Sequence, residues 1–192
     1  GVTGAQISVD PSMLEASVRD VLNVSAPRRL VVLEPLKIVL ENYPHSSAIE
    51  IEVPNFPQNP ELGTHKIILD SVVYIEQSDF KLEPEKGYRR LAPGQSVGLR
   101  HANLVLILKE VKKDASGHIT ELICECQSTE KAEKPKAFIQ WVSQPIQIEV
   151  RLYDLLFKHK NPEDTNEVPA GFLSDVKSDS KTVLQSFADR SL

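Results

Sequence analysis

A cluster of cationic side chains lies between residues 87 and 101, where the sequence reads GYRRLAPGQSVGLRH. The planar, two-donor fork of arginine suits the recognition of phosphate groups and of base edges in nucleic acids. A solvated basic surface has the same composition, and this plainer interpretation is equally open from the stretch alone. The sequence from Lys81 to Lys113 holds eight Lys and Arg against three Glu, a local balance of +5 in a chain of net charge −5. The rest of the chain is therefore acidic, which argues against indiscriminate nucleic-acid binding.

Residues that could support catalysis or bind a metal show no productive spacing. The sequence contains no phosphate-binding loop, no dinucleotide-binding glycine motif, no nucleophile elbow and no zinc-protease motif. His118, Cys124 and Cys126 supply three candidate zinc ligands on one hairpin arm, without a second pair to complete a tetrahedron. We expect no metal site, no cofactor in this chain and two free thiols packed in a core.

The composition is that of a globular protein of one or two domains, with 192 residues of which 41% are hydrophobic. No run of eighteen apolar residues occurs, and the opening GVTGAQISVDPS lacks the features of a secretory signal. We therefore expect a cytoplasmic protein that does not enter a membrane.

The elements that must position the basic stretch begin with a helix. Asp10 is suited to cap it, Pro11 suits its first position, and Leu14, Val18 and Leu22 share one face. After residue 24 the pattern changes to that of β-structure. Predicted strand segments fall within residues 30–40, 48–53, 65–76, 96–111, 119–126, 137–143 and 146–152. Many short strands and thirteen prolines predict a mainly all-β chain, a barrel or a sandwich.

Several segments, taken in order, carry a family resemblance. They read SAPRRLVVLEPLKIVLENY, VPNFPQNPELGTHK, VVYIEQSDF, GYRRLAPGQSVGLRHAN, KPKAFIQWVSQPIQIEVRLYDLLF and NPEDTNEVPAGFLSDV. In this order, over about residues 1–176, they resemble the C-terminal anticodon-binding region of glutaminyl-tRNA synthetases of the eukaryotic cytosolic type.

The resemblance implies two small β-barrels, proximal and distal, preceded by a short helix. Residues 1–24 would connect to a catalytic domain of the same chain, and residues 25–192 would form the anticodon-binding region. The implied partner is the glutamine-accepting tRNA. The resemblance implies no binding to DNA or to a membrane. The implied ligase attaches glutamine to tRNA with ATP and magnesium in a catalytic domain whose signatures this sequence lacks, so this chain alone should be non-catalytic.

The resemblance also assigns tRNA-binding residues. Arg28 matches an arginine that contacts the middle anticodon base, although an arginine at a helix end also favours the helix dipole. Arg89 and Arg90 match a basic pair near the third base, and Arg100 a cation near the first. Because neighbours on a strand point to opposite faces, we assign Arg90 to the base and Arg89 to a phosphate or to solvent. Tyr88 is the aromatic residue that we consider for base contact.

Two departures limit the resemblance. Bacterial members have glutamine at the position of Gly87 and arginine at that of Gly98, so contacts from these positions do not transfer. Members also continue into a Phe-Gln-Phe-Glu-Arg-x-Gly-Tyr-Phe segment, which implies a distal barrel that is truncated at its C-terminus here.

Three alternatives stay open. The same fold would serve a glutamyl-tRNA synthetase, and a purely structural β-barrel could act as an adaptor in a multi-aminoacyl-tRNA synthetase complex. The opening helix could bind a partner helix, although a domain joint needs no such partner.

Trp141 stands among alternating apolar residues, which favours core packing over base stacking.

Overall fold

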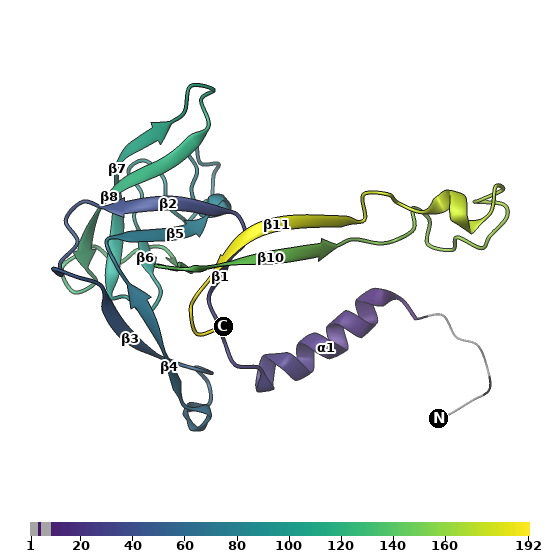
Figure 1. Cartoon of the computed structure of the whole chain (residues 1–192), viewed down its shortest axis with the longest axis horizontal. Helices are drawn as coiled ribbons and strands as arrows, with labels where there is room; N and C mark the ends of the chain where they lie inside the picture. The colour runs from purple at the N-terminus through teal and green to yellow at the C-terminus, as the bar shows by residue number, and fades with distance from the viewer. Residues whose placement is uncertain (1–3, 5–8) are drawn as a thin grey trace.

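The computed structural model describes residue 4 and residues 9–192 (Figure 1). Within these residues one α-helix, α1 (Pro11–Ser25), precedes a region of strands, short 3₁₀ turns and loops. The strands are β1 (Val31–Val32), β2 (Pro35–Leu40), β3 (Ile49–Pro54), β4 (Thr64–Leu69), β5 (Val72–Glu76), β6 (Val97–Leu99), β7 (Leu104–Lys113), β8 (Ile119–Ser128), β9 (Phe138–Ile139), β10 (Ile146–Tyr153) and β11 (Lys181–Ala188). The prediction of a mainly-β chain preceded by one short helix is confirmed.

Helix α1 begins as its sequence predicts. The Asp10 carboxylate accepts a hydrogen bond from the Ser12 amide at 3.0 Å, and Pro11 occupies the first turn. None of its residues is buried, so its apolar face, including Leu14 and Val18, is exposed. The predicted connection of residues 1–24 lies partly outside the described residues, and its boundary at residue 24 stays a prediction.

A six-stranded sheet in the order β5-β2-β8-β7-β6-β9 forms the body of the protein. The two edges of this sheet meet where Tyr74 of β5 and Val142, three residues after β9, exchange backbone hydrogen bonds of 2.8 and 3.0 Å. This contact closes the sheet into a barrel and leaves no free edge there.

The interior of the barrel is apolar. Trp141, which was predicted to be a core residue, is 1% exposed and donates its indole N–H to the Arg100 carbonyl at 2.8 Å. Cys124 and Cys126 are free and buried on the same face of β8, as their spacing predicted. Burial raises the pKa of the Cys124 thiol to about 12, so it is an inert core residue.

A second sheet, in the order β1-β11-β10, extends from the barrel as a long ribbon (Figure 1). At the end of this ribbon His159 Nδ1 lies 2.5 Å from the buried Asp175 carboxylate. Lys160 in the same tip lies 3.5 Å from Asp10 at the start of α1. In the part of the chain that the structure describes, no helix combines the length and the apolar character needed to cross a membrane.

The basic stretch itself is less regular than we expected. Arg89 and Arg90 lie in a loop, so the expectation that they are neighbours on a strand is wrong. The predicted strand at 96–111 is divided into β6 and β7 by a turn in which His101 and Asn103 have φ values of 66° and 54°. A bulge between Leu108 and Glu110, which the length of this segment allowed for, is present in β7.

Candidate functional site

The loop that carries Tyr88, Arg89 and Arg90 is fixed by one ion pair and three hydrogen bonds. Arg90 Nη1 lies 2.7 Å from Asp79 Oδ1, and the Tyr88 hydroxyl donates to the Ser78 carbonyl at 3.1 Å. The Gln95 side-chain amide donates to the carbonyls of Tyr88 at 3.1 Å and of Arg90 at 2.5 Å. The Asp79 and Gln95 side chains and the Ser78 carbonyl, which flank the loop in the sequence, therefore hold it in place.

Burial and neighbouring charges shift the pKa values of Asp79 and Tyr88. Burial raises the pKa of the Asp79 carboxyl, and the Arg90 guanidinium opposes that shift. Burial, with the Asp79 carboxylate as a further cause, raises the pKa of Tyr88 to about 12. Tyr88 is thus neutral at physiological pH, and Lys81 lies over its ring at 5.2 Å.

A cationic hollow of about 440 Å³, the tyrosine–lysine pocket, is lined by Gly87, Tyr88, Arg89 and Lys136. Lys136 donates to Oε1 of Gln95 at 2.9 Å, so the residue that holds the loop also holds this lysine. Arg89 is exposed. The pocket brings together two of the predicted residues and one lysine that sequence reasoning did not single out.

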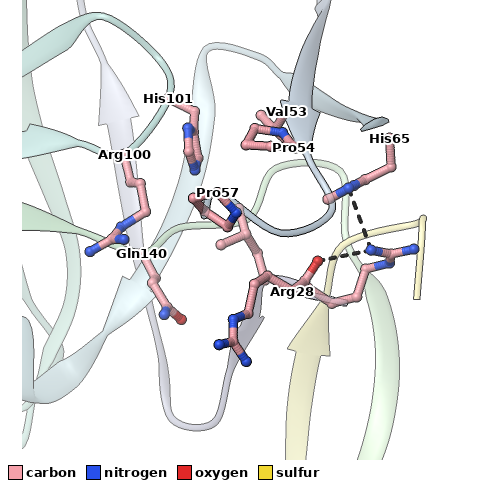
Figure 2. Close-up of a pocket in the computed structure, with 10 residues that line it drawn as sticks. Arg28, Val53, Pro54, Pro57, His65, Arg100, His101 and Gln140 are labelled. Carbon is pink, nitrogen blue, oxygen red and sulfur yellow. Dashed lines mark hydrogen bonds between the residues drawn. The ribbon is translucent and has the colours of Figure 1, made fainter. Parts of the chain in front are cut away.

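A second cavity, of about 240 Å³, is the arginine–histidine pocket, defined by Arg28, Arg29, His65, Arg100 and His101 (Figure 2). Gln140 also lines it and lies with Arg100 at one wall, while His65 lies at the other end. Three arginines and two histidines, with no carboxylate among the described lining residues, make the pocket suited to an anion or to electronegative base edges.

Arg28 and Arg29 are held in this pocket by protein groups. Arg28 donates from Nη2 to the Asn23 carbonyl at 2.9 Å, at the C-terminal end of α1, and its guanidinium lies 4.8 Å from the centre of the Phe56 ring. Arg29 donates to the carbonyls of Arg28 and Ser191 at 2.8 and 3.0 Å. The helix-end role that the sequence allowed for Arg28 is present in the structure, and its role toward a base stays a prediction.

The two histidines are disposed toward the neutral state. His65 Nδ1 lies 2.9 Å from the Asn55 side-chain oxygen and 3.4 Å from Arg29 Nη1. Its other nitrogen, Nε2, is buried without a hydrogen-bond partner. Burial, and then the Arg29 charge, lower the pKa of His65, and burial, and then Arg100, lower that of His101. An anion bound here would reverse part of both shifts.

The segment from Lys136 to Gln140 connects the two pockets. Lys136 lines the first and Gln140 the second, and five residues span at most about 14 Å between them. The segment is fixed against β6 by hydrogen bonds from the Gly98 amide to Ala137 at 2.9 Å and from the Arg100 amide to Ile139 at 3.0 Å. The pockets are therefore parts of one surface.

Four of the eight Lys and Arg side chains from Lys81 to Lys113, Arg90 among them, form ion pairs with carboxylates. Lys81, Lys109 and Lys112 pair with Glu85, Glu125 and Glu121 at 2.6, 2.6 and 3.0 Å. Within the described residues, Arg89 and Arg100 form no ion pair, and both line a pocket. The structure thus separates paired cations from those that are available to a ligand.

The five predicted residues divide between the pockets. Tyr88 and Arg89 line the first, Arg90 lines a wider opening around it, and Arg28 and Arg100 line the second. Sequence reasoning missed Arg29, His65, His101, Lys136 and Gln140. Among residue 4 and residues 9–192, no group of three or more His, Cys, Asp or Glu side chains is placed to hold a metal ion.

Comparisons with known proteins identify the family of this chain. The family model described as tRNA synthetases class I (E and Q), anti-codon binding domain, matches residues 26–127, and a second model with the same description matches residues 138–192. The chain is 71% identical over its whole length to a probable glutamine–tRNA ligase of Drosophila melanogaster. It is 54% identical, over 96% of its length, to a glutamine–tRNA ligase of Bos taurus, and 41% identical over 96% to one of Tolumonas auensis.

The chain spans only a part of these relatives, 25% of the fly protein, 24% of the bovine protein and 34% of the bacterial one. The matched family models nonetheless cover both the barrel and the ribbon that follows it. On this match, and with a barrel that bears two cationic pockets, the chain belongs to the anticodon-binding domains of the class I tRNA synthetases for glutamate and glutamine.

Proposed function

We propose that this chain reads the anticodon of a glutamine-accepting tRNA, as the tRNA-binding part of a ligase that joins glutamine to that tRNA. The observation that carries the proposal is the pair of cationic pockets linked by the segment from Lys136 to Gln140. Unpaired bases in RNA loops are recognised on their base edges while cations neutralise the backbone. Two adjacent pockets with exposed and held arginines supply both kinds of contact.

The choice of glutamine over glutamate is supported by the names of the relatives, which are glutamine–tRNA ligases at 71% and 54% identity. The proposal includes a catalytic domain that binds ATP and magnesium in the same parent protein, in the cytoplasm. This chain would then position the tRNA and perform no chemistry. Glutamine-dependent pyrophosphate exchange with ATP by the purified 192-residue chain would contradict that part of the proposal.

A binding experiment tests the proposed function directly. Glutamine tRNA, the same tRNA with its anticodon changed, and glutamate tRNA are each titrated with the purified chain. We expect glutamine tRNA to bind most tightly. Preference for the glutamate anticodon would favour a glutamyl role, and equal, negligible binding to all three would favour the structural adaptor.

The salt dependence of tRNA binding separates contacts to the phosphate backbone of the RNA from contacts to its bases. Because only a few unpaired cations line the two pockets of an acidic protein, log Kd should change with log salt with a slope of a few units at most. Affinity that does not change with salt would show that phosphates are not contacted.

A further inference from the structure

An exposed aromatic ring lies between the two pockets. Phe138 of β9 pairs with Gly98 of β6, and Phe138 is 45% exposed. A Cβ atom at Gly98 would lie 2.4 Å from Cδ1 and Cε1 of the ring, a distance that real Cβ contacts do not show. The ring is therefore seated directly on the Gly98 backbone, and its position depends on glycine at that site.

The neighbours of the ring are polar and positively charged. Phe138 and Gln140 are exposed, whereas the intervening Ile139 and the following Trp141 are buried, so Phe138 and Gln140 face outward together. Arg100, two residues beyond Gly98, shares the arginine–histidine pocket with Gln140. Lys136, two residues before Phe138, lines the tyrosine–lysine pocket. A flat apolar ring thus separates two cationic hollows.

We propose that Phe138, supported by Gly98, is a stacking surface for one unpaired base of the RNA, between the two pockets. This inference rests on the proposed function. Every base has a π face, and an aromatic ring beside backbone-binding cations is the usual arrangement by which proteins hold single strands. The charge of the surroundings favours a polyanion over an apolar protein segment. Among the described residues no carboxylate lines either of the two pockets, and Glu85, which lines the wider opening around the first, is paired with Lys81 at 2.6 Å.

Phe138 is better placed for stacking than Tyr88, the aromatic residue that the sequence favoured. The Tyr88 hydroxyl is engaged with the Ser78 carbonyl, and Lys81 lies over its ring. The two most exposed aromatic residues elsewhere, Tyr153 at 73% and Phe172 at 49%, lie on the ribbon of β10 and β11 and its tip, and they line neither pocket. Tyr153 therefore serves as a matched control.

The test uses the anticodon stem-loop of glutamine tRNA, with 2-aminopurine placed in turn at each unpaired loop position. We expect the wild-type chain to quench the fluorescence of the base at one position by stacking. Phe138→Ala and Phe138→Leu should remove this quenching and weaken binding by roughly 5- to 20-fold, while Phe138→Trp retains both. Tyr153→Ala should behave like the wild type.

The outcomes separate this inference from the proposed function. If the wild type binds the stem-loop but Phe138→Leu quenches and binds as the wild type does, the stacking role is excluded and the anticodon-binding function stands. If the wild type does not bind the stem-loop at all, both proposals fail. Thermal unfolding of each variant establishes that the variants are folded, and Phe138→Leu keeps an apolar side chain against Gly98 if the alanine variant does not fold.

Discussion

Arg90 Nη1 lies 2.7 Å from Oδ1 of Asp79, whose side chain is only 8% exposed, while half of the arginine side chain remains open to solvent. One edge of the guanidinium is therefore committed to a buried carboxylate and the rest can face a ligand. This contact fixes the direction of the fork before any RNA arrives, which favours a specific contact over a mobile one.

Replacing Arg90 by alanine should destabilise the chain, because Asp79 would remain buried without its partner. We expect the free energy of unfolding to fall by about 1–3 kcal/mol. Arg89→Ala is the matched control, since Arg89 is exposed and should change stability by no more than about 0.5 kcal/mol. Urea denaturation of the two variants measures both values, and equal stabilities would mean that the pair contributes nothing.

Arg28 and Arg90 should differ from Arg89 in whether lysine can replace the arginine in tRNA binding. If Arg90 and Arg28 contact base edges, alanine at either site should cost about 1–3 kcal/mol toward cognate tRNA and reduce discrimination, and lysine should not rescue it. Arg89 is exposed and forms no ion pair among the described residues, so if it contacts a phosphate, lysine should suffice there. Titration of cognate and anticodon-changed tRNA decides this, and wild-type behaviour of Arg28→Lys and Arg90→Lys would make both residues generic cations.

Arg28 should also stabilise the end of α1, because its Nη2 donates to the Asn23 carbonyl at 2.9 Å. We expect Arg28→Ala to lower the helical circular dichroism signal and the free energy of unfolding by about 0.3–1 kcal/mol. Arg19→Ala, in the exposed middle of the same helix, is the control. An unchanged helix together with lost discrimination between tRNAs would assign Arg28 to the base alone.

Acidification should have opposite effects on stability and on RNA binding. The pKa values of His65 and His101 lie below the usual 6.5 in the folded chain, so the unfolded chain takes up protons first as the pH falls. Above about pH 6.5 both histidines are neutral in the folded and unfolded chain, and the free energy of unfolding does not depend on them. As the pH falls from that value toward the folded pKa values, protonation of the unfolded chain lowers the free energy of unfolding. Protonation adds charge to the arginine–histidine pocket, so tRNA affinity should rise over the same range.

Urea denaturation and tRNA titration at several pH values test this pair of effects. In His65→Gln the loss of stability on acidification should be smaller than in the wild type. A wild-type affinity that falls together with stability would show that these histidines do not face the RNA.

Gly98→Ala should strain the contact between β6 and β9. The added Cβ would lie 2.4 Å from the Phe138 ring, so the ring must move, at a cost of about 1–3 kcal/mol. The double variant Gly98→Ala, Phe138→Ala removes the clash and should regain most of this stability. Additive losses in the double-mutant cycle would mean that the strain lies elsewhere.

Local patterns in the sequence were enough to define most of the elements. Asp10 and Pro11 placed the start of α1, and the alternation around Cys124 and Cys126 placed both thiols in the core, because caps and strand periodicity depend on neighbouring residues only. The same alternation in AFIQWVS identified Trp141 as buried, and it carried an unused signal that Phe138 and Gln140 face outward.

Only the tertiary structure decided which cations are available and which are held. Lys109 and Glu125 belong to different strands, β7 and β8, as do Lys112 and Glu121, so their pairing depends on the register between those strands. Arg28 and Arg100 are 72 positions apart, yet line one pocket because the closed barrel brings β6 near the end of α1. Charge composition is a property of the chain, whereas a binding surface depends on long-range packing, which no local pattern encodes.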